Sequence, residues 1–382
     1  MRVLVHAIDF APLIGGEETF LQNLGGVAER GVGIRLTMAT RTPAGSFDDG
    51  ALPFQVVRRP GFGLLWRLVG AADVVHVSGP ILLTLLMAWL RRKPVVVSHH
   101  MYHSACPNGL LVHHPDESVC DGAFLAGRYG ECIRCNAGEH GWLRSSLSLL
   151  STFPRRWFCR RADANVPRTE HVARRIALPR TRTIQHGIRD QREGGPRAPR
   201  VRAHPEFVYV GRLVREKGLV LLLRAVKRLS GEGHRFRLTF IGDGPERESL
   251  ECEASDLDLE EHVSFVGSLE RNDLEAALAG VAAVVMPSTW EETAGLAAIE
   301  HMMRGGVVIA ADIGGLGEVV GDGGIRFKAG DEAALADALR KLLEDPEAAI
   351  ELGRKARQRA AERFNHDRMV DDYIALYGSV SR

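Results

Sequence analysis

The sequence predicts an α/β protein built from two doubly wound parallel sheets, and three observations lead to this class. The chain has 382 residues, which exceeds the usual size of a single hydrophobic core. Short apolar segments alternate with helical segments along the chain, a pattern typical of parallel strands covered by helices on both faces. A stretch rich in Arg, Gly and Pro interrupts this alternation near the middle of the chain, as linkers do.

The first series of elements begins at the N-terminus. A buried-strand pattern is followed by a loop with Pro and Gly and then by a helical pattern, and apolar strands recur up to residue 98. The predicted strands are Arg2–Ile8, Val32–Ala39, Val74–Val77 and Pro94–Ser98, and the predicted helices are Glu17–Ala28 and Ile81–Trp89.

A second series follows the linker. Its predicted strands are Glu206–Val210, Arg237–Ile241, Val263–Val266, Ala283–Met286 and Val307–Ala310. Its predicted helices are Leu219–Ser230, Glu246–Ser255, Arg271–Ala279, Glu332–Leu343 and Pro346–Phe364. Both series predict Rossmann-like domains, which bind ligands at the carboxyl ends of their strands. We therefore expect two such domains facing a cleft, the first at residues 1–190 and the second at 206–364, joined by a linker at 191–205.

The bulk composition excludes several classes of protein. A net charge of +1 argues against a nucleic-acid protein defined by overall basicity. The opening MRVLVHAIDF lacks the longer apolar region of a signal peptide, and the longest apolar run, Pro80 through Leu90, is too short to span a bilayer. We therefore expect a cytoplasmic protein.

Two stretches of the second series carry candidate binding groups. Arg212 and Lys217 lie in the loop Gly211–Gly218 between a strand and a helix, where they could bind a diphosphate. A charged surface loop is the alternative. In the stretch Met286–Glu318, Glu292 and Glu300 flank a run of small residues. If both lie on one helix, they are separated by a rise of about 12 Å and about 80° around it, although two solvated glutamates would explain the spacing equally well.

The motifs GRLVREKG, IGDGPE, FVGSL, PSTWEETAGLAAIE and DIGGLGEVV follow one another along the chain. In this order they resemble the retaining GT-B glycosyltransferases of family 4, the glycosyl transferases group 1 type. The resemblance implies transfer of a sugar, a hexose by analogy, from a nucleotide diphosphate sugar of the UDP or GDP type to a hydroxyl acceptor, without a catalytic metal. The alternative is a sugar-nucleotide-binding protein without transferase activity, or an epimerase of related architecture.

The resemblance also implies residue roles. Arg212 and Lys217 match the pair that neutralises the donor diphosphate, Glu292 the glutamate near the donor sugar, and Glu300 the glutamate that binds the ribose. His100 matches a histidine that contacts the donor sugar or orients the acceptor, with His99 as the competing assignment. The remaining predicted donor-binding residues are Gly15, Gly16, Gly242, Val266, Thr293, Ala294, Gly295 and Leu296. In this family the last helix, here within residues 365–382, usually crosses back to the first domain.

Four cysteines lie in an insertion at about residues 103–140 with little helix or strand pattern. They are Cys106, Cys120, Cys132 and Cys135, and the last two form a CxxC element. Structural zinc, free or redox-active thiols, and disulfides are all compatible with this spacing. A similar insertion occurs in a subset of the family.

Residues 144–189 contain far more arginines than acidic residues. The densest group comprises Arg155, Arg156, Trp157, Phe158, Arg160 and Arg161. A basic and aromatic surface can bind anionic lipid at the inner face of a membrane. An anionic acceptor and an ordinary solvated helix face are the alternatives.

Overall fold

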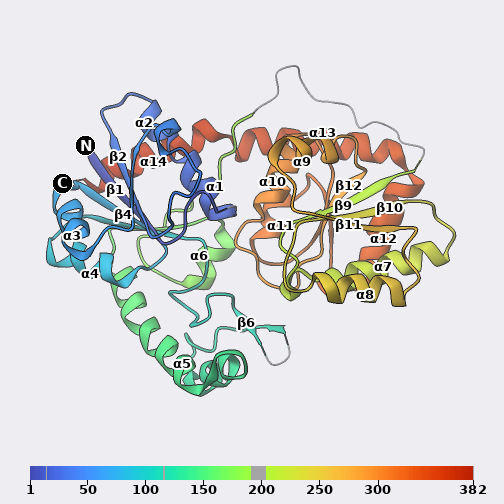
Figure 1. Ribbon diagram of the computed structural model, residues 1–382, viewed down its shortest axis with the longest axis horizontal. Coiled ribbons are helices and arrows are strands. Elements are labelled where there is room, and N and C mark those ends of the chain that lie inside the picture. The colour runs from blue at the N-terminus through green and yellow to red at the C-terminus, as the bar shows by residue number, and fades with distance from the viewer. Residues whose placement is uncertain (14, 115–116, 191–203, 382) are drawn as a thin grey trace. The chain divides into compact units, whose positions relative to one another are not determined.

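The computed structural model describes residues 1–13, 15–114, 117–190 and 204–381 (Figure 1). The chain divides into two compact units. Unit 1 comprises Met1–Arg189 and Phe364–Arg382, and unit 2 comprises Asp190–Arg363. The predicted linker lies outside the described residues, except for its last two positions.

Unit 1 contains a six-stranded parallel sheet in the order β3-β2-β1-β4-β5-β8. The strands are β1 (Arg2–Ala7), β2 (Arg35–Thr40), β3 (Gln55–Arg58), β4 (Val74–Ser78), β5 (Val95–His99) and β8 (Ala164–Pro167). The strand order changes direction at β1 and β4, so this is a doubly wound sheet, as predicted. The edge strand β3 was not predicted, because QVVR offers only two apolar residues.

Adjacent residues of the central strands point into separate hydrophobic cores on the two faces of this sheet. Val3 and Val5 of β1 pack with α1 (Gly16–Asn23), α2 (Gly26–Glu29) and α14 (His366–Val380). Leu4 packs with α3 (Phe62–Ala71), α4 (Leu82–Leu90) and α6 (Glu170–Ile176). Burial on both faces explains why β1 and β4 are nearly continuously apolar.

The predicted helix Glu17–Ala28 is in fact two helices that are separated near Leu24 and Gly25. A Cβ atom on Gly25 would lie 2.9 Å from the carbonyl oxygen of Gln22 and equally close to Pro53 and Phe54. Glycine is therefore required at this close contact, and two successive glycines weaken a helix.

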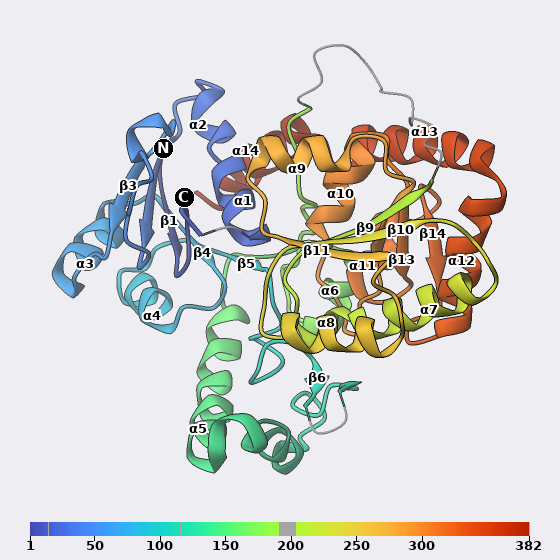
Figure 2. The same ribbon diagram turned by 45° about the vertical axis from the view of Figure 1, so that its right-hand side comes forward.

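The insertion contains more regular structure than its sequence indicates. A short antiparallel hairpin joins β6 (Val112–His113) and β7 (Ser118–Val119). The helix α5 (Tyr129–Cys159) is kinked at Gly141, which has φ 75° and ψ 158°. Both views show α5 projecting from the rest of unit 1 (Figures 1 and 2).

Unit 2 repeats the architecture with a parallel sheet in the order β11-β10-β9-β12-β13-β14. Its strands are β9 (Glu206–Val210), β10 (Arg237–Ile241), β11 (Val263–Gly267), β12 (Ala283–Met286), β13 (Val308–Ala311) and β14 (Ile325–Phe327). Its helices are α7 (Leu219–Gly231), α8 (Arg247–Asp256), α9 (Arg271–Leu278), α10 (Leu296–Met303), α11 (Gly314–Val320), α12 (Glu332–Glu344) and α13 (Pro346–Arg363).

The C-terminal helix α14 belongs to unit 1, although it follows unit 2 in sequence. Met369, Tyr373 and Tyr377 are fully buried in the same core as the β1 valines. The hydroxyl of Tyr377 also lies 2.7 Å from Nδ1 of His76 on β4. Unit 1 is therefore assembled from both ends of the chain.

Candidate functional site

An ion pair between Lys217 and Glu292 lies at the centre of the candidate site in unit 2. Nζ of Lys217 is 2.9 Å from Oε1 of Glu292. The hydroxyl of Ser288 donates a hydrogen bond to the same oxygen, and Nζ also lies 5.5 Å from the centroid of the Trp290 ring. Glu292 is buried, whereas Lys217 is half-buried. The carboxylate is therefore held in one orientation by two donors, and the ammonium group keeps access to solvent.

The loops that carry these two residues are joined by backbone contacts. Lys217 ends the short 3₁₀ turn Arg215–Lys217 after β9, and Glu292 follows β12. The amide of Thr289 donates to the carbonyl oxygen of Glu216 over 3.0 Å. Gly218 has φ 66°, and a Cβ atom there would lie 2.1 Å from the carbonyl oxygen of Pro287. Glycine is therefore needed for both the backbone angle and the close contact.

Glu292 lies in front of a helix, not on it. The helix α10 begins at Leu296, and its N-cap Gly295 has φ 78° and makes no side-chain cap. A Cβ atom on Gly295 would be 3.7 Å from Oε2 of Glu292, so the carboxylate adjoins the helix N-terminus. The predicted helical offset between Glu292 and Glu300 is therefore wrong, because only Glu300 lies on α10. The amide groups of the first turn are those that helices use to bind anions.

The other predicted residues of unit 2 also lie at the carboxyl ends of its strands. Gly242 follows β10, where a Cβ atom would be 1.9 Å from the carbonyl oxygen of Gly211. Its amide donates to the carbonyl oxygen of Gly267 over 2.8 Å. The exposed Val266 precedes Gly267 at the carboxyl end of β11. Arg212 is exposed, and no hydrogen bond or ion pair links its guanidinium to another described residue. Thr293 and Ala294 lie in the loop between Glu292 and α10.

The predicted residues Gly15, Gly16 and His100 belong to unit 1. Gly15 is the N-cap of α1 and makes no side-chain cap. His100 follows β5 and is buried. Nη2 of Arg168 lies 3.0 Å from Nε2 of His100. Burial, with a contribution from the nearby Arg168 charge, holds the pKa of His100 well below its usual value. The competing His99 is fully buried, with Nε2 3.0 Å from the side-chain oxygen of Asn165.

Sequence reasoning missed Arg168, which is fully buried after β8. Its guanidinium donates to the hydroxyl of Tyr373 over 2.8 Å and lies 3.7 Å from the centroid of the Phe20 ring. A charged residue directly after an apolar strand was the available signal. Its hydrogen bond to Tyr373 depends on α14, which is distant from Arg168 in sequence.

Sequence reasoning also missed Glu17, next to the predicted glycines on α1. Ser78 donates a hydrogen bond to Oε1 of Glu17 over 2.5 Å. Burial, together with the nearby charges of Glu18 and Asp9, raises the pKa of Glu17 to about 7, although the Ser78 hydrogen bond acts in the opposite direction. This carboxyl group therefore titrates close to neutrality.

The four cysteines of the insertion are near one another as free thiols. Sγ of Cys106 is 2.9 Å from the side-chain oxygen of Asn108, whose amide nitrogen is 3.7 Å from Sγ of Cys135. Burial, together with the neighbouring cysteines, raises the pKa of Cys132 to about 12. Within the described ranges, no three His, Cys, Asp or Glu side chains are arranged to hold a metal ion. The donor chemistry suits zinc but this arrangement does not fit it, so the zinc site stays a prediction.

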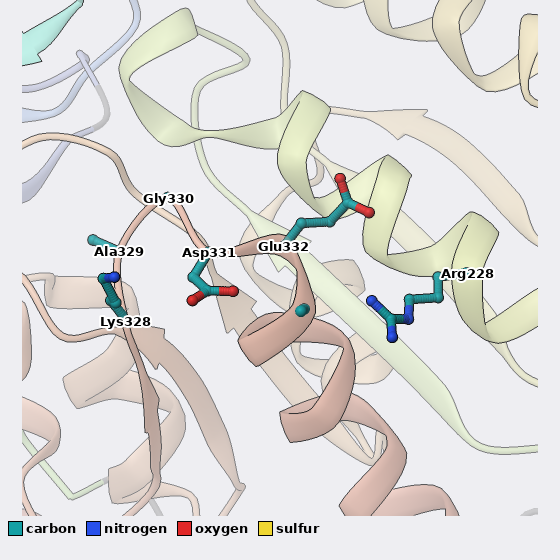
Figure 3. Close-up of a pocket in the computed structure, with 7 residues that line it drawn as sticks. Arg228, Lys328, Ala329, Gly330, Asp331 and Glu332 are labelled. Carbon is teal, nitrogen blue, oxygen red and sulfur yellow. The ribbon is translucent and has the colours of Figure 1, made fainter.

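A surface hollow of about 540 Å³ lies elsewhere in unit 2 (Figure 3). It is lined by Arg228 of α7 and by residues 328–333 at the start of α12. Asp331 accepts a hydrogen bond from the amide of Ala334 and thereby caps α12. None of the predicted site residues lines this hollow.

The two units have the architecture of GT-B glycosyltransferases. Sucrose-phosphate synthase from Thermosynechococcus elongatus matches with a TM-score of 0.73 and 21% identity, over 99% of this chain and 98% of that one. Anabaena Alr3699/HepE in complex with UDP-glucose matches with a TM-score of 0.73 and 18% identity, over 99% and 100% of the two chains. These likenesses confirm the predicted fold class.

Residues 197–359 match the family model described as Glycosyl transferases group 1. The resemblance read from the motifs is thus confirmed for this domain. Glycogen synthase from Mycobacterium tuberculosis is 32% identical over 256 residues, which cover 64% of this chain and 61% of that protein. The 2-deoxystreptamine glucosyltransferase from Streptomyces kanamyceticus is 30% identical over 222 residues, 58% of this chain and 52% of that protein. The chain therefore spans only 61% and 52% of the lengths of these relatives.

Proposed function

We propose that this protein is a retaining glycosyltransferase of the family 4 type that transfers a sugar, a hexose in our proposal, from a nucleotide diphosphate sugar to a hydroxyl acceptor. The observation that carries the proposal is the Lys217–Glu292 ion pair of 2.9 Å at the N-terminus of α10. The similar Anabaena structures in complex with UDP and UDP-glucose support a donor of this chemical class.

The donor diphosphate would bind to Arg212, Lys217 and the first amide groups of α10. The Arg212 side chain has no partner among the described residues, so its planar donor group is available to phosphate oxygens. Two cations and a helix N-terminus would stabilise the negative charge that develops on the leaving diphosphate. Their contribution to the rate is electrostatic.

The remaining donor contacts follow from the positions of the strand ends. Glu300, on the first turns of α10, would accept hydrogen bonds from the ribose hydroxyls. The exposed Val266 and the backbone at Gly242 would contact the base. From unit 1, His100 would contact the donor sugar, and the backbone at Gly15 and Gly16 would approach the phosphates.

Glu292 would position the donor sugar and compensate positive charge at the reacting carbon. In the ligand-free protein its carboxylate is already bound by Lys217 and Ser288. Both contacts are to Oε1, whereas Oε2 faces the N-terminus of α10. Retention by front-face attack, which the family resemblance implies, requires no enzymatic nucleophile of the kind that retaining glycosidases use, so we assign Glu292 no nucleophilic role. When the diphosphate binds, Lys217 would share its charge between Glu292 and the phosphates.

A nucleotide screen tests the donor site. UDP or GDP at saturating concentration should raise the melting temperature, because a ligand that binds only the folded state stabilises it. The Arg212→Ala variant should lose most of this shift. Arg235→Ala is the matched control, since Arg235 is also exposed but precedes β10 at the opposite end of the sheet. The donor site would be refuted if neither nucleotide stabilised the wild-type protein.

The alternative is a sugar-nucleotide-binding protein without transferase activity, or an epimerase. A non-catalytic protein would bind the nucleotide but leave the sugar donor intact, and an epimerase would convert the donor without an acceptor. Incubation with a panel of nucleotide sugars and hydroxyl acceptors distinguishes the three outcomes. We expect NMR of the product to show that the transferred sugar keeps the anomeric configuration that it had in the donor.

The proposed transfer needs no metal at the donor site. For the cysteine insertion we propose structural zinc held by Cys106, Cys120, Cys132 and Cys135. Its support is the chemistry of four neighbouring thiols, and it requires them to move from their present positions. Metal analysis of protein purified without added zinc tests this. About one zinc per chain, absent from the Cys132→Ser variant, is expected, and a value near zero rejects the zinc site.

A further inference from the structure

We propose that one face of unit 1, formed by α4 and the part of α5 after its kink, binds to the surface of an anionic lipid bilayer. We call this face the α4–α5 face. It contains none of the predicted donor-site residues, so the inference goes beyond the proposed function and concerns where the protein works.

The part of α5 that follows Gly141 exposes its apolar residues to solvent. Trp142, Leu143, Leu147 and Leu150 are between 57% and 75% exposed, and Phe153 and Trp157 continue the same row. Trp142 and Leu143 are adjacent, and the later members follow at intervals of three or four residues, so all six lie along one side of the helix. Ser145 and Thr152, by contrast, are buried. Leu149 and Cys159 are buried on the same side, so this segment leaves most of its large apolar residues in solvent while it buries two polar ones, which is unusual for a helix of a globular protein.

The helix α4 extends this exposed apolar row. Leu83, Leu86, Trp89 and Leu90 are exposed, although the other side of α4 packs into the unit 1 core. The rings of Trp89 and Trp157 meet edge to face, with centroids 5.8 Å apart. The exposed apolar residues of the two helices therefore form one continuous face. Such a large exposed apolar patch is typical of an interaction site.

All charged side chains within the two segments that form this face are positive, and Glu139 and Asp163 flank the second segment. Residues 140–162 contain five arginines and no Asp or Glu, and Arg91, Arg92 and Lys93 follow α4 directly. Arg144, Arg160 and Arg161 are exposed, and none of these three forms an ion pair with a carboxylate in the described part of the chain. Arg161 also lies over the Trp157 ring, 3.8 Å from its centroid.

The structure changes which residues of the predicted basic group face a membrane. Arg156 is half-buried and donates to the carbonyl oxygens of Ile176 and Ala177 over 2.9 and 3.0 Å, so it holds the end of α6. Only the exposed arginines remain for lipid headgroups. Trp157 belongs to the predicted group, but most of the apolar contact comes from Trp142, Leu143, Leu147 and Leu150 nearer Gly141, which the predicted group did not include.

An anionic bilayer fits this combination of chemistry. Tryptophans and leucines enter the boundary between headgroups and acyl chains, and arginines at its edge bind lipid phosphates. In the described part of the chain, no helix is long and apolar enough to cross a membrane. In this proposal the exposed apolar side of α5 lies on the bilayer surface. A second copy of this chain would present the same positive charges, which would repel each other across the contact.

Flotation of the full-length protein with vesicles tests the proposal. Vesicles of phosphatidylglycerol and phosphatidylcholine should bind the wild-type protein, and pure phosphatidylcholine vesicles should bind it much less. The double variant Leu143→Glu/Leu147→Glu should reduce binding by about tenfold or more, because it places two charges in the apolar contact. Ile350→Glu is the matched control: Ile350 is 50% exposed on α13 of unit 2, and binding should not change.

A second variant tests the charge contribution. Arg144→Gln/Arg160→Gln should weaken binding to the anionic vesicles severalfold and leave the weak binding to neutral vesicles unchanged. The proposal is overturned if wild-type protein does not bind, if the leucine variant binds normally, or if neutral vesicles bind equally well. It is also overturned if light scattering shows a dimer that the leucine variant dissociates. Flotation requires no sugar donor, so these outcomes are independent of nucleotide binding.

Discussion

Arg168 donates a hydrogen bond from Nη2 to Nε2 of His100 over 3.0 Å, in the buried interior of unit 1. A guanidinium group can only donate, so Nε2 of His100 must accept. The His100 ring is therefore neutral and carries its proton on Nδ1. Nε2 of His100 would therefore take no part in proton transfer.

Long-range ¹H–¹⁵N NMR of histidine-labelled protein should detect this tautomer. The His100 signals, identified by their loss in His100→Gln, should show a protonated Nδ1 and an unprotonated Nε2 across the neutral pH range. Burial and the Arg168 charge both disfavour the imidazolium form. A signal from Nε2–H in the wild-type protein would contradict the assignment directly, without any variant of the buried Arg168.

The two glutamates of the proposed donor site should respond differently to mutation. Glu292→Gln should lower kcat by about 10²-fold or more with little effect on donor affinity, because a positioned charge acts mainly in the transition state. Glu300→Ala should mainly raise the KM for the donor. Steady-state kinetics with a varied donor separates these effects. Both roles would be refuted if Glu292→Gln mainly raised the KM for the donor and Glu300→Ala mainly lowered kcat.

Gly218 should be the least replaceable glycine of the loop that carries Lys217. Gly218→Ala combines an unfavourable φ of 66° with a contact of 2.1 Å to the Pro287 carbonyl oxygen. We expect a loss of about 2–4 kcal/mol in the free energy of unfolding.

Gly231→Ala is the control for this substitution. Gly231 ends α7 and does not require a positive φ, and a Cβ atom on it would meet no neighbouring described atom within 4 Å. The free energy of unfolding of Gly231→Ala should equal that of the wild-type protein or exceed it by about 0.5 kcal/mol. Urea denaturation of both variants measures the difference, and equal values would argue against the proposed strain at Gly218.

The stability of unit 1 should depend on pH through Glu17. Its pKa is about 7 in the folded protein, against an ordinary value of 4.5. The folded state therefore binds more protons than the unfolded state between these values, so stability is fully present below pH 4.5 and falls as pH rises to about 7. Between about pH 5 and about pH 8, the free energy of unfolding of the wild-type protein should fall by about 2 kcal/mol more than that of Glu17→Gln. This difference is smaller than the full pKa shift would give, because the Glu17 carboxyl group is only half-buried. Identical pH profiles for both proteins would exclude Glu17 as the cause.

Much of the fold could be predicted because its signals are local. The central strands are apolar on both faces, and they alternate with helical segments of ordinary length. The end of a helix at Gly25 was harder to predict, since the contacts that require glycine there come from Pro53 and Phe54. Contacts between residues that are distant in sequence cannot be recognised from the local periodicity of apolar residues.

The candidate site was predicted from motifs, and its contacts depended on the three-dimensional structure. The spacing of Glu292 and Glu300 gave no sign that the first precedes the helix, because the left-handed conformation of Gly295 sets that boundary. The pairing of Lys217 with Glu292 joins residues that are 75 positions apart. Arg168 acquires its role only when β8 and α14 are brought together.

The return of α14 to unit 1 fixes the order in which the chain can fold during synthesis. The continuous segment of unit 2 leaves the ribosome complete while the first core still lacks Tyr373 and Tyr377, which are fully buried in the finished protein. Unit 2, although translated second, is therefore the first to have all of its sequence. Unit 1 has to wait, with part of its apolar interior open, until α14 has also been synthesised.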